Sequence, residues 1–195
     1  MKTEVEAKFL GVDFNEMRRK LGELGGVCEQ PMRLMRRVII EPDFLERRDA
    51  FIRVRDEGDR VTLTFKEFVD NSLSGARERE VVVSDFDETV EILKSGGLEH
   101  RSYQESRRET WRLGEVEIVL DQWPWINDYI EIEAPSEELV KQMADRLGLV
   151  WSDAVFGSVD TIYKRTYPNA KNRGVIDIKE VRFTSPSPKE LGERV

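Results

Sequence analysis

Apolar and polar side chains alternate with a period of two residues along most of this 195-residue chain. That period is typical of β-strands, in which successive side chains point to opposite faces of a sheet. The alternation predicts a sheet of about eight strands, which is the strongest constraint on the fold. The predicted strands cover residues 1–10, 33–40, 50–55, 60–66, 77–83, 103–113, 115–121 and 128–134.

Helical patterns interrupt the predicted strands. Asp13, Asp85 and Ser136 are suited to cap a helix N-terminus, and each precedes apolar residues at helical spacing. A glycine pair ends each of the first two helices, and a short fourth helix is predicted over residues 159–167. Strand-rich segments separated by single helices predict an α+β fold rather than a parallel doubly wound one.

The length and charge of the chain limit its organisation and its partners. We expect one folded domain over residues 1–167, followed by a polar tail over residues 168–195 that either wraps on the body or stays mobile. The net charge of -8 argues against nucleic-acid binding, which needs a basic surface. Arginines nevertheless cluster in several predicted strands, so an anionic small molecule remains a suitable ligand.

Cysteine usage and hydropathy indicate the compartment. No apolar run reaches membrane-spanning length, and no signal-peptide pattern is present, so we expect no membrane partner. Cys28 is the only cysteine, which excludes an internal disulfide and suits a cytoplasmic protein. Because His100 is the only histidine, a zinc site of the usual kind is nearly excluded.

One face of most predicted strands carries arginine or glutamate, opposite an apolar face. Arg53 and Arg55 share a strand face, as do Glu131 and Glu133. An ordinary antiparallel sheet with one face in water would explain this without any function. The predominance of arginine and glutamate favours another arrangement, because eight strands suffice to close a barrel around a small ligand. We therefore predict a closed, antiparallel, eight-stranded β-barrel with charges inside and helices packed outside.

A charged interior restricts the ligand. Buried charges must be paired or must bind something, because an unpaired one costs several kcal/mol. Arginine and lysine suit phosphate oxygens, whereas carboxylates would repel phosphate unless a hard divalent cation such as Mg²⁺ lies between them. Basic and acidic residues together therefore predict a polyphosphate bound with a metal ion.

The charged residues resemble the CYTH family, the triphosphate tunnel metalloenzymes, which includes thiamine triphosphatases, inorganic triphosphatases and class IV adenylyl cyclases. The resemblance rests on an N-terminal Glu-x-Glu-x-Lys strand, followed in order by an Arg-x-Arg strand, a strand ending in lysine, an arginine, a Leu-Asp step and a Glu-x-Glu strand. It covers about residues 1–163. The matching residues are Glu4, Glu6, Lys8, Arg53, Arg55, Lys66, Arg108, Leu120-Asp121 and Glu131-Ile132-Glu133.

The chain departs from the family pattern at several positions. Glu78 and Glu80 fit a middle Arg-x-Glu-x-Glu strand, but Ala76 stands where arginine is expected. Ser106 replaces a common lysine, and the second strand has Arg36 and Arg37 near the place of an acidic-aromatic pair. These departures concern substrate choice more than the fold.

The resemblance implies roles for the matching residues. It implies Mg²⁺ or Mn²⁺ as cofactor and a triphosphate-containing small molecule as substrate. The implied catalytic residues are Glu4, Glu6 and Lys8, the implied substrate-binding residues are Lys8, Arg53, Arg55, Lys66 and Arg108, and the implied metal ligands are Glu4, Glu6, Asp121, Glu131 and Glu133. The same carboxylates could instead form plain internal salt bridges with the arginines.

Three functions remain open from the sequence. Hydrolysis of a triphosphate is the first interpretation, because it needs no recognition of a base. A class IV adenylyl cyclase or a non-catalytic polyphosphate-binding module are the alternatives. The Trp123-Pro124-Trp125 loop could stack on an aromatic ring, or form a surface turn or a dimer contact. A homodimer is possible.

Overall fold

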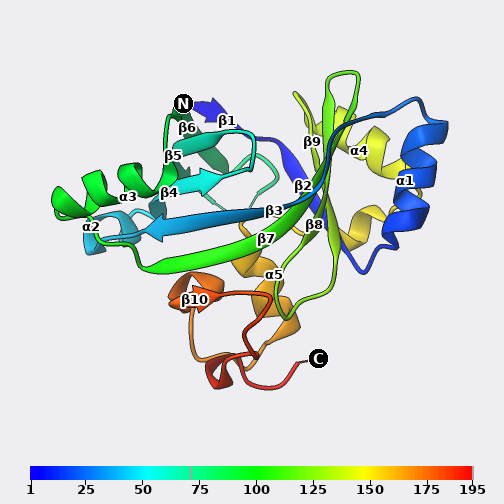
Figure 1. Cartoon of the computed structure of the whole chain (residues 1–195). Helices are drawn as coiled ribbons and strands as arrows, with labels where there is room; N and C mark the ends of the chain where they lie inside the picture. The colour runs from blue at the N-terminus through cyan, green and yellow to red at the C-terminus, as the bar shows by residue number, and fades with distance from the viewer. Residues whose placement is uncertain (71, 195) are drawn as a thin grey trace.

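A single curled sheet organises the molecule, shown in Figure 1 as a computed structural model of which residues 1–70 and 72–194 are described here. The strands are β1 Lys2–Thr3, β2 Glu6–Leu10, β3 Val27–Ile40, β4 Ala50–Asp56, β5 Val61–Phe68, β6 Ala76–Val83, β7 Ser102–Leu113, β8 Val116–Gln122, β9 Tyr129–Glu133 and β10 Glu180–Val181. The α-helices are α1 Phe14–Glu23, α2 Asp43–Glu46, α3 Phe86–Ser95, α4 Glu137–Arg146 and α5 Val159–Thr166. Three short 3-10 helices are η1 Trp151–Asp153, η2 Val175–Asp177 and η3 Lys189–Leu191.

The strands follow the order β1-β6-β5-β4-β3-β7-β8-β9-β2 with antiparallel neighbours, and β10 pairs in parallel with β7. The two ends of this order belong to one N-terminal segment. Thr3 of β1 lies opposite Arg77 of β6, whereas Glu6 of β2 lies opposite Glu133 of β9. The segment Lys2–Leu10 therefore contacts both edges of the sheet.

The α+β fold predicted from the sequence is confirmed, with differences in detail. All eight predicted strands are present, but the first is divided where the chain crosses from β6 to β9, and the tail contributes β10. The described residues thus form a curled sheet of ten strands, and a closed eight-stranded barrel is not established. The short helix α2 was not predicted, because four residues are too few for a helical period to be visible.

Helices α1 and α4 cover the apolar outer face of strands β8 and β9. Met17 and Leu21 of α1 and Met143 of α4 pack on Ile118 of β8 and Ile132 of β9 in a fully buried cluster. Asp13 caps α1 by accepting hydrogen bonds from the N–H groups of the first turn, as predicted. Among the described residues, no helix is long and apolar enough to cross a membrane.

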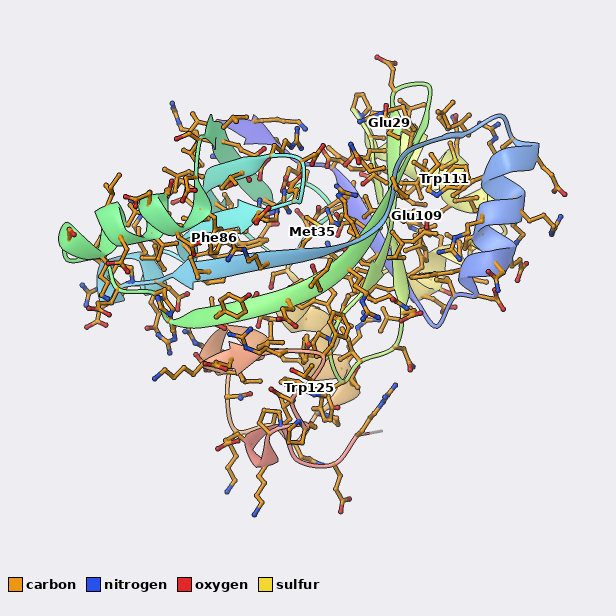
Figure 2. All side chains as sticks on the ribbon, viewed as in Figure 1. Glu29, Met35, Phe86, Glu109, Trp111 and Trp125 are labelled. Carbon is orange, nitrogen blue, oxygen red and sulfur yellow. The ribbon has the colours of Figure 1, made fainter. Side chains whose placement is uncertain are left out.

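A third helix, α3, packs at the other end of the sheet. Phe86 at the start of α3 is buried against Val38 of β3 and Val54 of β4 (Figure 2). Because these outer faces are covered by apolar contacts, the opposite, charged faces of β3 and β4 point inward.

The C-terminal residues pack on the body below the sheet (Figure 1). Ile162 and Tyr163 of α5 form a buried cluster with Val175 and Leu191. An ion pair of 2.7 Å joins Arg101 to Asp177, and another of 2.5 Å joins Arg173 to Glu41. These contacts could not be predicted from the polar composition of the segment, because they form only against the folded body.

Candidate functional site

The inward faces of the strands line a cavity of about 460 Å³. The pairing of the strands brings the charged side chains of this cavity together. Glu6 lies opposite Glu133, and Lys8 lies opposite Glu131, so β2 and β9 present one row of carboxylates and one lysine. Of the residues that the resemblance implied, the structure places the following in the cavity wall: Glu4, Glu6, Lys8, Arg53, Arg55, Lys66, Arg108, Glu131 and Glu133.

Lys8 lies at the centre of the carboxylate row. Its Nζ is 2.7 Å from Glu6 and 3.1 Å from Glu131. Burial alone would lower the pKa of Lys8, but the charges of Glu131 and Glu6 outweigh it and raise that pKa. Burial likewise would raise the pKa of Glu131, but Lys8 and Arg108 lower it to about 2. Lys8 and Glu131 are thus both charged at neutral pH.

Three carboxylates form an acidic cluster, defined as Glu4, Glu6 and Glu133. One oxygen from each lies within 4.8 Å of the others. Such a set of hard oxygen donors suits Mg²⁺ or Mn²⁺. Burial and the charge of Glu4 raise the pKa of the neighbouring Glu78 to about 7, and burial raises that of Glu133. The local excess of negative charge fits a divalent cation.

Three arginines form a basic cluster in the same cavity, defined as Arg37, Arg53 and Arg55. All three are at most 9% exposed. Each has a buried Nε with no hydrogen-bond partner in the described part of the chain. Burial, together with repulsion from Arg55 and Arg53, holds the pKa of Arg37 well below its usual range. Unpaired buried donors of one charge are costly without an anion, so the cluster is suited to bind one.

Carboxylates compensate the basic cluster only in part. Arg55 is 2.6 Å from Glu57, and Arg53 is 3.5 Å from Glu80. Arg37 forms no ion pair with a described carboxylate; its Nη2 donates to Ser106 Oγ at 2.6 Å. Internal salt bridges therefore exist in the cavity, as the alternative interpretation expected, but they leave positive charge uncompensated around Arg37.

Asp121 lies behind the cavity rather than in its wall. It is 0% exposed and is opposite Arg108 in the register of β7 and β8. Arg108 donates from Nε at 2.8 Å and from Nη2 at 2.5 Å to its two oxygens. This bidentate pair orients Arg108, whose Nη2 is 4.0 Å from Glu131. Of the five metal ligands implied by the resemblance, Asp121 is thus the one that the cavity does not contain.

The sequence interpretation assigned no role to Arg37. Arg36 and Arg37 are adjacent, so they point to opposite faces, and the sequence alone does not show which one faces inward. The structure pairs Arg36 with Asp56 at 3.0 Å on the outer side. Parity gave no signal, because Arg37 shares a face with Met35 and Ile39 and Arg36 shares one with Leu34 and Val38.

The two tryptophans of the 123–125 loop have different positions. Trp123 lines the cavity, and the guanidinium of Arg37 lies 4.6 Å from its ring centre. Trp125 instead donates from Nε1 to the carbonyl of Ser185 at 2.8 Å, near the C-terminal segment (Figure 2). Only Trp123 is therefore placed to meet a ligand.

Comparison with known proteins assigns the family. The family model of the CYTH domain matches residues 2–153, and the chain belongs to this family. None of the curated protein sequences gives a significant match.

Solved structures share the fold. PH1012 protein from Pyrococcus horikoshii OT3 is 26% identical with a TM-score of 0.66, covering 77% of this chain and 93% of that one. A candidate adenylate cyclase from Vibrio parahaemolyticus is 14% identical with a TM-score of 0.72, covering 83% and 97%. HpAC1 from Hippeastrum, a candidate adenylyl cyclase described as having a dominant triphosphatase activity, is 14% identical with a TM-score of 0.52, covering 80% and 91%.

Proposed function

We propose that this protein hydrolyses a triphosphate substrate with the help of a divalent metal ion. One observation carries the proposal: three buried arginines with unpaired Nε groups share a cavity with a cluster of three carboxylates. Cations alone would suit any anion. Carboxylates beside them favour a polyphosphate with a metal, because a divalent ion removes the repulsion between carboxylate and phosphate.

The N-terminal segment Lys2–Leu10 would complete the site by closing the curled sheet into a tunnel. Its support is the pairing of β1 with β6 and of β2 with β9, together with a hydrogen bond of 3.0 Å from Glu4 N to Ala76 O. Glu4 lies where this segment passes from β6 to β9. Closure of the sheet and formation of the acidic cluster would therefore depend on the same segment.

The cationic residues would hold the phosphate chain. Arg53, Arg55 and Arg37 offer planar donors, and Lys8 and Lys66 offer point charges. Arg108, fixed by Asp121, would contribute a further oriented guanidinium. A protein accelerates phosphoryl transfer mainly by positioning the phosphate chain and neutralising its charge. A cavity in which these cationic side chains are already in place would therefore lower the activation barrier.

The acidic cluster would hold Mg²⁺ or Mn²⁺, with Glu131 beside it. When bound, the ion would neutralise phosphate charge and activate the attacking group. In hydrolysis, water attacks a terminal phosphorus, the bond to the bridging oxygen breaks, and phosphate and a diphosphate are released. Glu6 and Glu133 would hold the ion in the same cavity as the basic cluster.

A second candidate is an adenylyl cyclase. Its support is Trp123 in the cavity wall, since a cyclase must bind a nucleoside as well as phosphates. The ribose 3′-oxygen would then attack in place of water, and pyrophosphate would leave. A non-catalytic polyphosphate-binding module is less well supported, because anion binding alone does not need the acidic cluster.

One panel of assays tests these candidates. Tripolyphosphate, thiamine triphosphate and ATP are each incubated with the protein and Mg²⁺ or Mn²⁺, and phosphate, pyrophosphate and cyclic AMP are measured together. We expect phosphate release that EDTA abolishes. Cyclic AMP with pyrophosphate would support the cyclase instead, and no release from any substrate would refute both enzymatic functions.

A further inference from the structure

The Trp123-Pro124-Trp125 loop, which we call the tryptophan loop, connects the cavity wall to the C-terminal part of the chain. Trp125 has a φ of 69°, in the left-handed region that a bulky side chain rarely adopts. A residue keeps such a strained conformation only where its surroundings impose it, and strained residues are concentrated at functional sites. The contacts around Trp125 must therefore stabilise this conformation.

Three hydrogen bonds hold the tryptophan loop from the C-terminal side. Tyr163 Oη donates to the carbonyl of Pro124 at 2.6 Å, and Tyr167 Oη donates to the carbonyl of Trp125 at 2.7 Å. Trp125 Nε1 donates to the carbonyl of Ser185 at 2.8 Å. Both tyrosines are buried, so water competes little for the hydrogen bonds that they form. The loop is thus fixed by residues that follow it by 38 positions or more in the sequence.

Trp123, at the other end of the loop, depends on these contacts for its position. It is buried in the same apolar cluster as Tyr163, and the two rings meet edge to face with their centres 6.5 Å apart. Its Nε1 has no hydrogen-bond partner among residues 1–70 and 72–194. The indole is therefore held by packing and by the backbone of the loop rather than by a hydrogen bond of its own.

The indole of Trp123 in turn supports Arg37 of the basic cluster. The Arg37 guanidinium lies 4.6 Å from the centre of the Trp123 ring, a distance typical of a cation–π contact. Its Nη2 donates to Ser106 Oγ, whereas its Nε has no hydrogen-bond partner in the described part of the chain. Arg55 lies opposite Arg37 in the sheet, so repulsion would move an unsupported guanidinium away from the basic cluster. The contact with Trp123 opposes this movement.

We propose that Tyr163, Tyr167 and the Ser185 carbonyl are positioning groups of the anion site. They hold the tryptophan loop in place, and the loop keeps the Arg37 guanidinium oriented for an anion in the cavity. This inference rests on the proposed function, in which Arg37 binds phosphate. All three positioning residues lie beyond residues 2–153, which match the family model. The C-terminal part of the chain thus sets the anion affinity of the family domain through Arg37.

A double-mutant cycle tests this positioning role. The Kd of tripolyphosphate is measured by calorimetric titration, in EDTA and again in Mg²⁺, for the wild type, Tyr163→Phe, Tyr167→Phe and Arg37→Met. Each phenylalanine variant is also combined with Arg37→Met. Phenylalanine keeps the ring and removes only the hydroxyl that holds the loop. Tyr103→Phe is the matched control, because Gln104 beside it lines the cavity and Tyr103 therefore points to the other face of β7.

We expect Tyr163→Phe and Tyr167→Phe each to raise the Kd of tripolyphosphate by about fivefold, because a less well oriented guanidinium binds an anion more weakly. In the Arg37→Met background the same substitutions should change Kd by less than about twofold, since the residue through which they act is absent. Tyr103→Phe should match the wild type. An unchanged Kd in both single variants would overturn the inference. The same factor in both backgrounds would also overturn it, because a general loss of stability does not depend on Arg37.

Two further features keep the test decisive. If loss of the buried Tyr163 hydroxyl prevents folding, Tyr167→Phe carries the cycle alone, because the Tyr167 hydroxyl is only partly buried.

Titration in EDTA measures binding alone, so it separates this inference from the proposed function. Coupling of the tyrosines to Arg37 in a protein that releases no phosphate would support the inference and refute hydrolysis. An active triphosphatase in which the cycle shows no coupling would refute the inference alone. A wild type that binds tripolyphosphate in neither buffer would refute the inference together with the anion-binding role of the basic cluster.

Discussion

Arg37 of β3 and Arg55 of β4 lie directly opposite each other in the sheet, and each has a buried Nε without a hydrogen-bond partner among the described residues. Two like charges on facing strands repel each other, and burial strengthens that repulsion. A fold would not gain stability from such a pair. The pair is instead expected where an anion supplies the missing charge, so its cost in the free protein is evidence for binding.

Replacing Arg37 by methionine should therefore stabilise the free protein while weakening anion binding. The contacts of Arg37 with Ser106 and Trp123 do not neutralise its charge. We expect the free energy of unfolding of Arg37→Met to rise by about 1–4 kcal/mol, as for other buried ions replaced by apolar residues. Urea denaturation measures this change.

Tripolyphosphate should stabilise Arg37→Met less than the wild type, since binding to the folded state alone raises the melting temperature. Arg36→Met is the matched control, because Arg36 points outward and is partly exposed. It should leave the tripolyphosphate effect unchanged. A lower stability of free Arg37→Met, with an unchanged ligand effect, would contradict the assignment of Arg37.

Lys66→Ala should chiefly weaken substrate binding. Lys66 Nζ is 2.5 Å from Glu4, at the border of the acidic cluster, where it can also reach a phosphate oxygen. Loss of one charge-assisted hydrogen bond should raise KM about tenfold or more, with kcat within about threefold. Steady-state kinetics give both values, and Lys94→Ala on the exposed side of α3 serves as control. An unchanged KM would exclude Lys66 from the site.

Glu6→Gln should weaken the metal site. The substitution keeps the size of the side chain but removes one negative charge from the acidic cluster. We expect turnover to fall and the Mn²⁺ concentration for half-maximal activity to rise by about tenfold, since metal affinity depends on ligand charge. Activity measured across a Mn²⁺ titration tests this, with the exposed Glu99→Gln as control. Wild-type behaviour of Glu6→Gln would contradict the site assignment.

Much of the fold could be predicted because it depends on local patterns. Alternation located the strands of the sheet except β10, and Asp13, Asp85 and Ser136 cap the helices they were predicted to cap. The division between β1 and β2 could not be predicted, because it depends on which two distant strands the N-terminal segment meets.

The inward position of residues such as Arg53 and Arg55 could be predicted, because they alternate with apolar neighbours that occupy the other face of the strand. Arg37 and Asp160, which also line the cavity, were missed for a common reason. Arg37 needed the register of β3 against β4, and Asp160 needed the packing of α5 against η2. Both are contacts between separate elements, which residue spacing does not encode.

Asp121→Asn should separate a positioning residue from a metal ligand. Both oxygens of Asp121 accept hydrogen bonds from Arg108, and removal of the Asp121 charge leaves the Arg108 guanidinium with only Glu131, at 4.0 Å, to compensate it. We expect a loss of about 3 kcal/mol in the free energy of unfolding and a lower kcat/KM. The Mn²⁺ concentration for half-maximal activity should stay at the wild-type value, whereas Glu133→Gln should shift it. A shift in Asp121→Asn as large as in Glu133→Gln would restore Asp121 as a ligand.

Asp160 should make the stability of the free protein fall as pH rises from about 4 to 6. Burial raises its pKa from 3.8 to about 6 in the folded state, so over this range the folded protein binds more protons than the unfolded chain. Stability falls with pH wherever the folded state binds more protons, and the decrease should be about 1–3 kcal/mol. Asp160→Asn should lack this component, while Asp145→Asn, an exposed change on α4, should keep it. Urea denaturation of the three proteins at pH 4, 5, 6 and 7 measures the effect. Identical pH profiles for Asp160→Asn and the wild type would show that the Asp160 carboxyl is solvated rather than enclosed in the cavity wall.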